Sequence, residues 1–63
     1  MKLAELMKEK RYMAKDIAEC CGVSASAVTH WLNGDCMPSI ENLKKIAQFL
    51  NVSIDELLGV KRD

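Results

Sequence analysis

The sequence predicts an all-α fold, a compact bundle of five short helices. Apolar residues recur at intervals of three and four along five segments, which is the helical period. Ser, Asn or Gly stands where most of these segments begin or end, as helix capping requires. The 63 residues make one small domain near the lower limit for folding on a single core. Because only 5% of them are aromatic, that core must consist mainly of aliphatic, Ala and Met side chains.

The first two helices are expected at residues 1–10 and about 14–21, joined by residues 11–13. In the first, the residues expected to face the core are Leu3, Leu6 and Met7. In the second, they are Ile17, Ala18 and Cys21. Because the first helix begins almost at Met1, the N-terminus is expected to be the native one.

A tight turn is expected between the second helix and a third. Gly22 follows the last core residue of the second helix, where helices commonly end in a left-handed residue. Ser24 is a good N-cap for the next helix. Ala18 is small enough to let the two helices cross at close range. The spacing of Ala18, Gly22 and Val28 is that of a DNA-binding helix-turn-helix, although short helical hairpins also occur as plain packing units.

The third helix, residues 25–32, has an apolar and a polar face. Its inward residues are Ala27, Val28 and Trp31, with Leu32 at the boundary. Its outward residues are Ala25, Ser26, Thr29, His30 and Asn33. Solvated helix faces usually carry Lys and Glu, whereas these side chains are small and uncharged. This favours close approach to a DNA groove over an ordinary solvated face, since Ser and Thr hydrogen-bond several base edges.

Two further helices complete the bundle. Ser39 caps the fourth, and Asn51 ends it because Asn tolerates left-handed backbone angles. The core residues of the fourth helix are Leu43, Ile46, Ala47 and Leu50. Residues 53–56 have the pattern of a capping box and open a short fifth helix, which Gly59 stops. Residues 60–63 are expected to form a short polar tail.

Three stretches of the chain carry a family resemblance. These are the pattern Gly-Val-Ser-x-x-x-Val-x-x-Trp-x-x-Gly at residues 22–34, Pro-Ser-Ile-Glu-Asn-Leu at 38–43, and residues 50–58. Together they resemble the Cro/repressor-like (XRE) family of bacterial and phage regulators, over residues 3–59. The resemblance implies a lambda-repressor-like domain at residues 1–59 that binds operator DNA, usually as a dimer.

The resemblance also assigns roles to single residues. The expected base contacts are Ala25, Ser26, Thr29 and His30. The expected phosphate contacts, through side chain or backbone N–H, are Ser24, Asn33 and Gly34. The residues Asn33 and Gly34 are also a strong turn signal, so they have a structural role in either case. For His30, contact with guanine or phosphate and plain solvent exposure are both open.

The chain departs from its relatives at two places. Where many relatives have Thr-Gln at the start of the second helix, this chain has Met13 and Ala14, so a cap and a phosphate contact are expected to be lost. Lys15 is the nearest substitute for that contact. An Arg–Glu pair common in relatives is replaced by Met7 and Leu32. Because both charges have become apolar together, the two side chains are expected to touch.

The charge balance is unusual for a DNA-binding protein. Nine Lys and Arg against nine Asp and Glu give a net charge of zero, whereas phosphate neutralisation supplies much of the affinity for DNA. The distribution of charge along the chain is more favourable for DNA binding. Basic residues gather near the first turn of the bundle at Lys8, Lys10, Arg11 and Lys15, and residues 24–33 contain no acidic side chain. The loop at residues 35–38 offers no positive charge, and phosphates would repel Asp35 unless it turns away.

Other functions are excluded by what the chain lacks. Its three cysteines form no C-x-x-C pair, and with one His there is no plausible metal site; Cys21 is best explained as a small core residue. No Ser-His-Asp or Cys-His arrangement and no phosphate-binding Gly-rich loop appears, so the chain is not expected to be an enzyme or to hold a cofactor or small-molecule substrate. Without a signal peptide or membrane span, it is expected in the cytoplasm.

The sequence therefore predicts a sequence-specific transcriptional regulator, a repressor or Cro-like protein, with the helix at 25–32 in the major groove of double-stranded DNA. A homodimer is expected because a domain this small reads few base pairs. The candidates for its partner surface are Phe49, Ile54 and Val60. The alternative is a protein-interaction module on the same scaffold that has lost DNA binding. Its support is the zero net charge, Ala14 in place of Gln, and Asp35 in the loop.

Overall fold

The computed structural model describes residues 1–59, and within them it contains five α-helices and no strand. The helices are α1 (Leu3–Lys10), α2 (Ala14–Cys21), α3 (Ala25–Asn33), α4 (Ile40–Leu50) and α5 (Ile54–Leu58). The predicted all-α bundle is confirmed, and four of the helices begin where the sequence places them. The expected polar tail at 60–63, which includes Val60, lies outside the described residues.

Two helix ends differ from the prediction. Helix α1 begins at Leu3 rather than Met1, because the backbone N–H of Lys2 donates to the carbonyl of Leu57 in α5 at 2.8 Å. The second residue is thus held by α5 and serves as the cap residue of α1. Helix α3 continues one residue further, to Asn33, and ends where Gly34 adopts a left-handed conformation at φ 82°.

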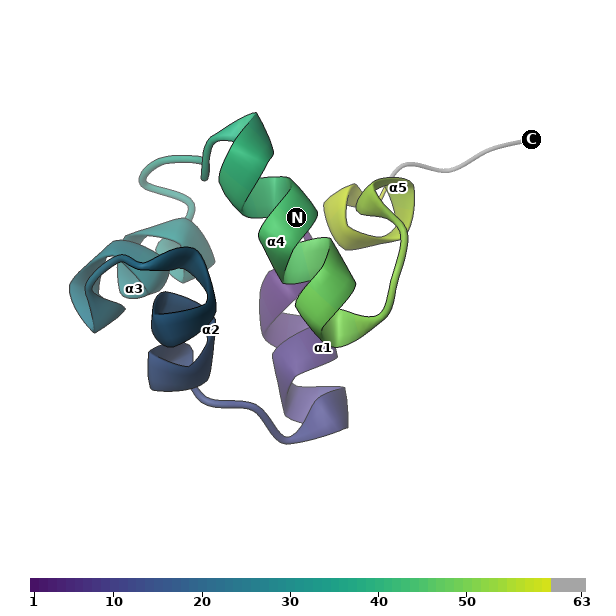
Figure 1. The fold of residues 1–63 in the computed structure, drawn as a ribbon, viewed down its shortest axis with the longest axis horizontal. Helices are drawn as coiled ribbons and strands as arrows, with labels where there is room; N and C mark the ends of the chain where they lie inside the picture. Colours follow the sequence, from purple (N-terminus) through teal and green to yellow (C-terminus); the bar gives the residue numbers. More distant parts are fainter. Residues whose placement is uncertain (60–63) are drawn as a thin grey trace.

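Helix α4 holds the bundle together. It packs against α1 and α5 on one side and against α2 on the other, while α3 packs against α2 (Figure 1). Every helix contributes to one core, whose most completely buried side chains are Leu3, Ile17, Val28, Ile46, Leu50 and Leu57. No polar side chain among the described residues is buried. The core is therefore aliphatic, as the composition predicts.

Serine caps start three helices as expected. The hydroxyl oxygens of Ser24, Ser39 and Ser53 accept hydrogen bonds from the backbone N–H three residues later, at 3.2, 3.2 and 3.0 Å. Only one half of the expected capping box of α5 is present, the bond from the Glu56 N–H to the Ser53 hydroxyl. No bond between the Glu56 side chain and the Ser53 backbone occurs within residues 1–59. Asn51 ends α4 in the left-handed conformation, as predicted.

The N-cap residue of α2, Met13, makes no side-chain cap hydrogen bond, as the sequence predicts. The backbone N–H of Met13 instead donates to Asp16 Oδ2 at 2.8 Å. A carboxylate in the first helical turn also interacts favourably with the positive end of the helix dipole. Asp16 therefore satisfies the backbone N–H of Met13 at the start of the helix.

Of the three cysteines, only Cys21 is buried in the core, whereas Cys20 is half-buried and Cys36 is exposed. Cys20, Cys21 and Cys36 form no disulfide. Burial raises the pKa of the Cys21 thiol, with the neighbouring Cys20 adding to the effect, so Cys21 is a neutral core side chain. Among residues 1–59 no three His, Cys, Asp or Glu side chains are placed to hold a metal ion. None of the described helices is long and apolar enough to cross a membrane.

Candidate nucleic-acid interface

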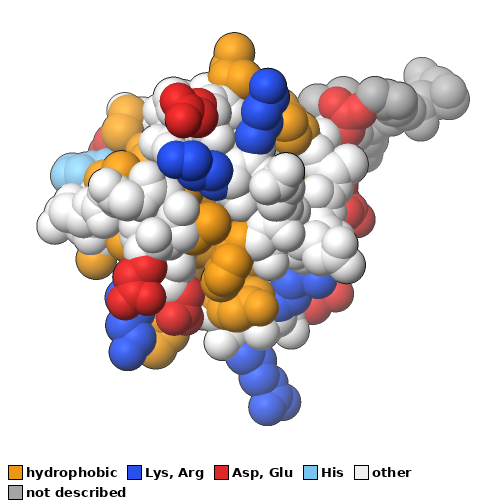
Figure 2. Space-filling model, viewed as in Figure 1, with side chains coloured by type: hydrophobic (Ala, Val, Ile, Leu, Met, Phe, Trp, Pro, Cys, Tyr) orange, Lys and Arg blue, Asp and Glu red, His pale blue; other side chains and the backbone are white. Residues whose placement is uncertain are grey.

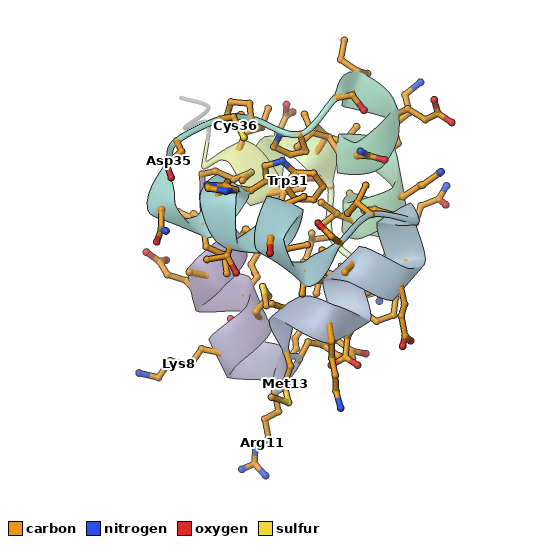
Figure 3. All side chains as sticks on the ribbon, turned by 90° about the vertical axis from the view of Figure 1, so that its left-hand side faces the viewer. Lys8, Arg11, Met13, Trp31, Asp35 and Cys36 are labelled. Atoms are coloured by element: carbon orange, nitrogen blue, oxygen red, sulfur yellow. The ribbon has the colours of Figure 1, made fainter. Side chains whose placement is uncertain are left out.

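Helix α3 lies on the outside of the bundle with its polar face uncovered (Figure 3). Val28 and Trp31 are 0% and 8% exposed and fix the inner face, while Leu32 is half-buried against the core. The exposed residues are those that the sequence placed outward: Ala25, Ser26, Thr29, His30 and Asn33. The structure therefore brings the four predicted base-contacting residues together on one exposed surface, which we call the α3 face (Ala25, Ser26, Thr29 and His30).

The crossing of α2 and α3 depends on a small residue. Ala18 is 5% exposed, and its carbonyl accepts a hydrogen bond from the N–H of Val23 at 3.0 Å, across the turn that follows α2. Gly22 makes that turn in the left-handed conformation, as predicted. Because Ala18 presents only a methyl group to its neighbours, α3 is held close to α2 with its outer side exposed.

The hydroxyl of Thr29 has a partner within the helix. Thr29 Oγ1 donates to the carbonyl oxygen of Ala25 at 3.1 Å. The hydroxyl hydrogen of Thr29 is thus bonded within the helix. The hydroxyl oxygen can still accept a hydrogen bond, and the methyl group is still available for apolar contact. In this conformation Thr29 can accept from a base amino group or contact a thymine methyl.

The imidazole of His30 also has a partner, which the sequence reasoning missed. His30 Nδ1 lies 3.0 Å from Asp35 Oδ2, and both side chains are well exposed, at 59% and 60%. The acidic side chain that phosphates would repel is therefore turned toward the α3 face. A signal for this pairing was present in Gly34, because a left-handed residue after a helix folds the chain back beside its last turn.

The predicted phosphate contacts lie at both ends of α3 and on α2. Ser24 caps the first end and Asn33 is exposed at the last turn, while Lys15 is exposed in the first turn of α2. The backbone N–H of Gly34 donates to the carbonyl of Trp31 at 3.2 Å, so within the described residues it is already used. These residues thus flank the α3 face.

Charge is distributed unevenly around this face. Lys8 and Arg11 extend from the edge of the molecule below α3, near Met13, while Asp35 and Cys36 lie at the opposite edge (Figure 3). On another face, acidic and basic side chains are interspersed (Figure 2). Lys8 and Arg11 therefore extend from the end of α1, on the side of the molecule opposite Asp35.

The apolar surface agrees only in part with what the sequence suggested. Phe49 is exposed, at 37%, and its ring packs against that of Tyr12 at a 45° tilt with centroids 4.6 Å apart. Ile54, by contrast, is half-buried against the core. The most exposed large apolar side chains among the described residues are Ile40 at 72%, Met13 at 62% and Met37 at 60%. Sequence reasoning treated Ile40 only as part of a helix start and gave it no role.

The replacement of an ion pair by Met7 and Leu32 is consistent with their burial. Met7 is 6% exposed and belongs to the core, and Leu32 packs against the same core. Direct contact between these two side chains stays a prediction.

Comparison with known proteins gives a consistent result. A family model described as helix-turn-helix matches residues 3–57. The chain is 40% identical over 58 residues to the HTH-type transcriptional activator BcrR of Enterococcus faecalis, covering 92% of this chain and 28% of that protein. It is 36% identical over 58 residues to the cryptic phage CTXphi transcriptional repressor RstR of Vibrio cholerae serotype O1, covering 92% of this chain and 52% of that protein.

A solved structure is similar as well. The crystal structure of a transcriptional regulator from Listeria innocua matches with a TM-score of 0.89 and 34% identity, over 98% of this chain and 58% of that one. The chain thus spans 28% and 52% of the length of the two similar proteins and 58% of the solved one.

Proposed function

Because the chain belongs to the helix-turn-helix family, we propose that it binds double-stranded DNA sequence-specifically and regulates transcription. The observation that carries the proposal is the α3 face, which is exposed and carries no Lys, Arg, Asp or Glu side chain. An ordinary solvated helix would present Lys and Glu there. One of the similar proteins is named an activator and another a repressor, and we propose repression by occupation of a promoter.

In this proposal α3 enters the major groove and the α3 face reads bases. Ser26 and Thr29 hydrogen-bond base edges, and Ala25 meets a thymine methyl group. His30, at the end of the face, bonds a base through the ring nitrogen that Asp35 does not engage. The fully buried Val28 and the nearly buried Trp31 support this surface from below, so its side chains are held on a rigid element.

Phosphates are proposed to lie against Ser24, Asn33, Gly34 and Lys15. The hydroxyl of Ser24 can donate to a phosphate while its oxygen accepts from Ala27. Lys15 supplies a positive charge at the start of α2. Because the N–H of Gly34 is bonded to Trp31, we assign Gly34 a close backbone approach and Asn33 the hydrogen bond.

The oligomeric state and the cellular location of the protein belong to the same proposal. Residues 1–59 act as the DNA-binding domain, in the cytoplasm, as a homodimer on half-sites about 34–36 Å apart. Neither catalysis nor a cofactor or small-molecule substrate enters it. The exposed Met37 and Ile40 are where we place the contact with a second copy, in place of the half-buried Ile54.

The test is selection of bound sequences from a random duplex pool, followed by gel retardation on the selected site. We expect one enriched motif with two related half-sites. Ser26→Glu places a carboxylate on the α3 face and is expected to abolish retardation, because phosphates repel it. Gln48→Glu makes the same change of charge on the exposed side of α4 and should bind as the unmodified chain does.

The alternative function predicts the opposite result. A protein-interaction module on this scaffold would enrich no motif and retard no DNA at low salt at any protein concentration. That outcome would overturn the proposal. Equal loss of binding in Ser26→Glu and Gln48→Glu would instead show that α3 is not the reading element.

A further inference from the structure

The exposed pair of His30 and Asp35 has a consequence for base recognition. We propose that Asp35 is a specificity-determining positioning residue, which fixes the tautomer of His30 and thereby the bases that the α3 face accepts. This inference rests on the proposed function, because it concerns how α3 reads DNA. It assigns no direct DNA contact to Asp35 itself.

At the end of α3, His30 and Asp35 are joined by one backbone hydrogen bond and one side-chain contact. The chain leaves the helix through Gly34 in the left-handed conformation, and two backbone bonds close the turn. Gly34 N–H donates to Trp31 O at 3.2 Å, and Asp35 N–H donates to His30 O at 3.0 Å. This pair of bonds is the Schellman arrangement, which returns the second residue after the helix to its last turn. The side chain of Asp35 then reaches His30 Nδ1, with Oδ2 at 3.0 Å.

This contact decides where the imidazole carries its proton. An ionised carboxylate only accepts hydrogen bonds, so Nδ1 must be the donor in this pair. In the neutral ring the other nitrogen, Nε2, is then an acceptor. Without the carboxylate, the proton can occupy Nε2 instead, and that nitrogen becomes a donor.

The two tautomers recognise different bases. In the major groove, cytosine presents the N4 amino group and adenine the N6 amino group, both of which donate to an acceptor. Guanine presents only the acceptors O6 and N7. With Asp35 in place, the neutral ring of His30 therefore selects cytosine or adenine at its position and rejects guanine.

The tautomer is tested without DNA, by long-range ¹H–¹⁵N NMR of His30 at pH of about 8, where an ordinary imidazole is mostly neutral. The unmodified chain is expected to show the Nδ1–H form. Asp35→Asn removes the obligatory acceptor and is expected to shift the population toward Nε2–H. Asp35→Glu keeps a carboxylate and is expected to restore the Nδ1–H form. An unchanged tautomer in Asp35→Asn would overturn the inference.

Base preference is tested by selection from a random duplex pool at the same pH. The unmodified chain is expected to enrich cytosine or adenine at one position of each half-site. In Asp35→Asn, the affinity ratio of the cytosine-bearing site to the guanine-bearing site should fall by at least about fivefold. Equal melting temperatures of the two proteins will show that the fold is unchanged.

Two controls separate this effect from a change of charge. Glu19→Gln removes one negative charge from the exposed side of α2 and should leave base preference unchanged. In a His30→Ala background, Asp35→Asn should cause no further change in preference, because the ring through which Asp35 acts is gone. A full change in that background would assign base contact to Asp35 and overturn the inference.

Failure of the inference is distinguishable from failure of the proposed function. If the unmodified chain retards no DNA, the proposed function fails, and the inference fails with it. If the unmodified chain binds its selected site and Asp35→Asn binds with the same base preference, only the inference fails.

Discussion

At the scale of the residue, the α3 face is defined by hydrogen bonds that its side chains make within the protein. Thr29 bonds the carbonyl of Ala25, and His30 pairs with Asp35. Both polar groups are therefore oriented before any ligand approaches. A polar side chain that is already oriented loses less conformational entropy on binding, which favours recognition.

The role of Thr29 is tested by Thr29→Ala. The bond to Ala25 is exposed, and Ala has the higher helix propensity, so the free energy of unfolding should change by less than about 1 kcal/mol. Binding to the selected site should weaken by about fivefold, the cost of one lost hydrogen bond. Thermal melting and gel retardation measure the two effects.

The control for this change is Gln48→Ala, on the exposed side of α4, which should alter neither quantity. If Thr29→Ala melted the fold, the assignment of Thr29 to the outer side of α3 would be wrong.

At the scale of the element, α3 is placed by α2 more than by any other helix. Three features set that placement: the small side chain of Ala18, the left-handed Gly22 and the Ser24 cap. At the start of α2, the carboxylate of Asp16 accepts a hydrogen bond from the backbone N–H of Met13. The hairpin of α2 and α3 thus depends on side-chain hydrogen bonds to backbone N–H groups where each helix begins.

Ala18→Leu tests the helix crossing. Ala18 is 5% exposed, so three added carbon atoms have no room without moving α3. Overpacking of this kind costs about 1–3 kcal/mol. In a chain of this size each kcal/mol lowers Tm by about 4–8 °C, so calorimetry or circular dichroism should show a clear fall.

Glu19→Leu is the matched control, because it places the same side chain on the exposed neighbour in the sequence. Its Tm should change little. Equal Tm values for Ala18→Leu and the unmodified chain would show that the crossing has spare volume and that Ala18 does not set the approach of α3.

At the scale of the whole molecule, the net charge of zero limits what phosphate attraction can contribute. Lys8 and Arg11 extend from the end of α1, whereas Asp35 lies at the opposite edge and is paired with His30. We expect a shallow dependence of affinity on salt, with specificity from the groove contributing a larger share than in a strongly basic domain.

Lys15→Ala tests the proposed phosphate contact. Neutralising one phosphate contributes about 0.9 to the slope of log K against log salt concentration, so the slope should fall by about that amount. Affinity should fall for all duplexes alike. Retardation or fluorescence anisotropy across a salt series provides the measurement.

Lys44→Ala is the control, since Lys44 is exposed on α4 beside Val52 and Ile54, away from α3. Its slope should match that of the unmodified chain. An unchanged slope in Lys15→Ala would remove Lys15 from the phosphate-contacting set.

Much of the molecule follows from the sequence alone. The period of apolar residues and the caps at Ser24, Ser39, Asn51 and Gly59 determined the five helices and which side of α3 is exposed. These are local properties: a helical side chain points where its position in the turn directs it, whatever lies beyond.

Only the tertiary structure decided which groups are brought together from separate stretches. The bond from Lys2 to Leu57 set the start of α1, and the return of the chain after Gly34 placed Asp35 on His30. Gly34 signals that the chain turns back after α3, but residue types do not specify which side-chain atoms meet once it has turned. The outward face of α3 was therefore predictable, whereas the pairing of His30 with Asp35 at its end was not.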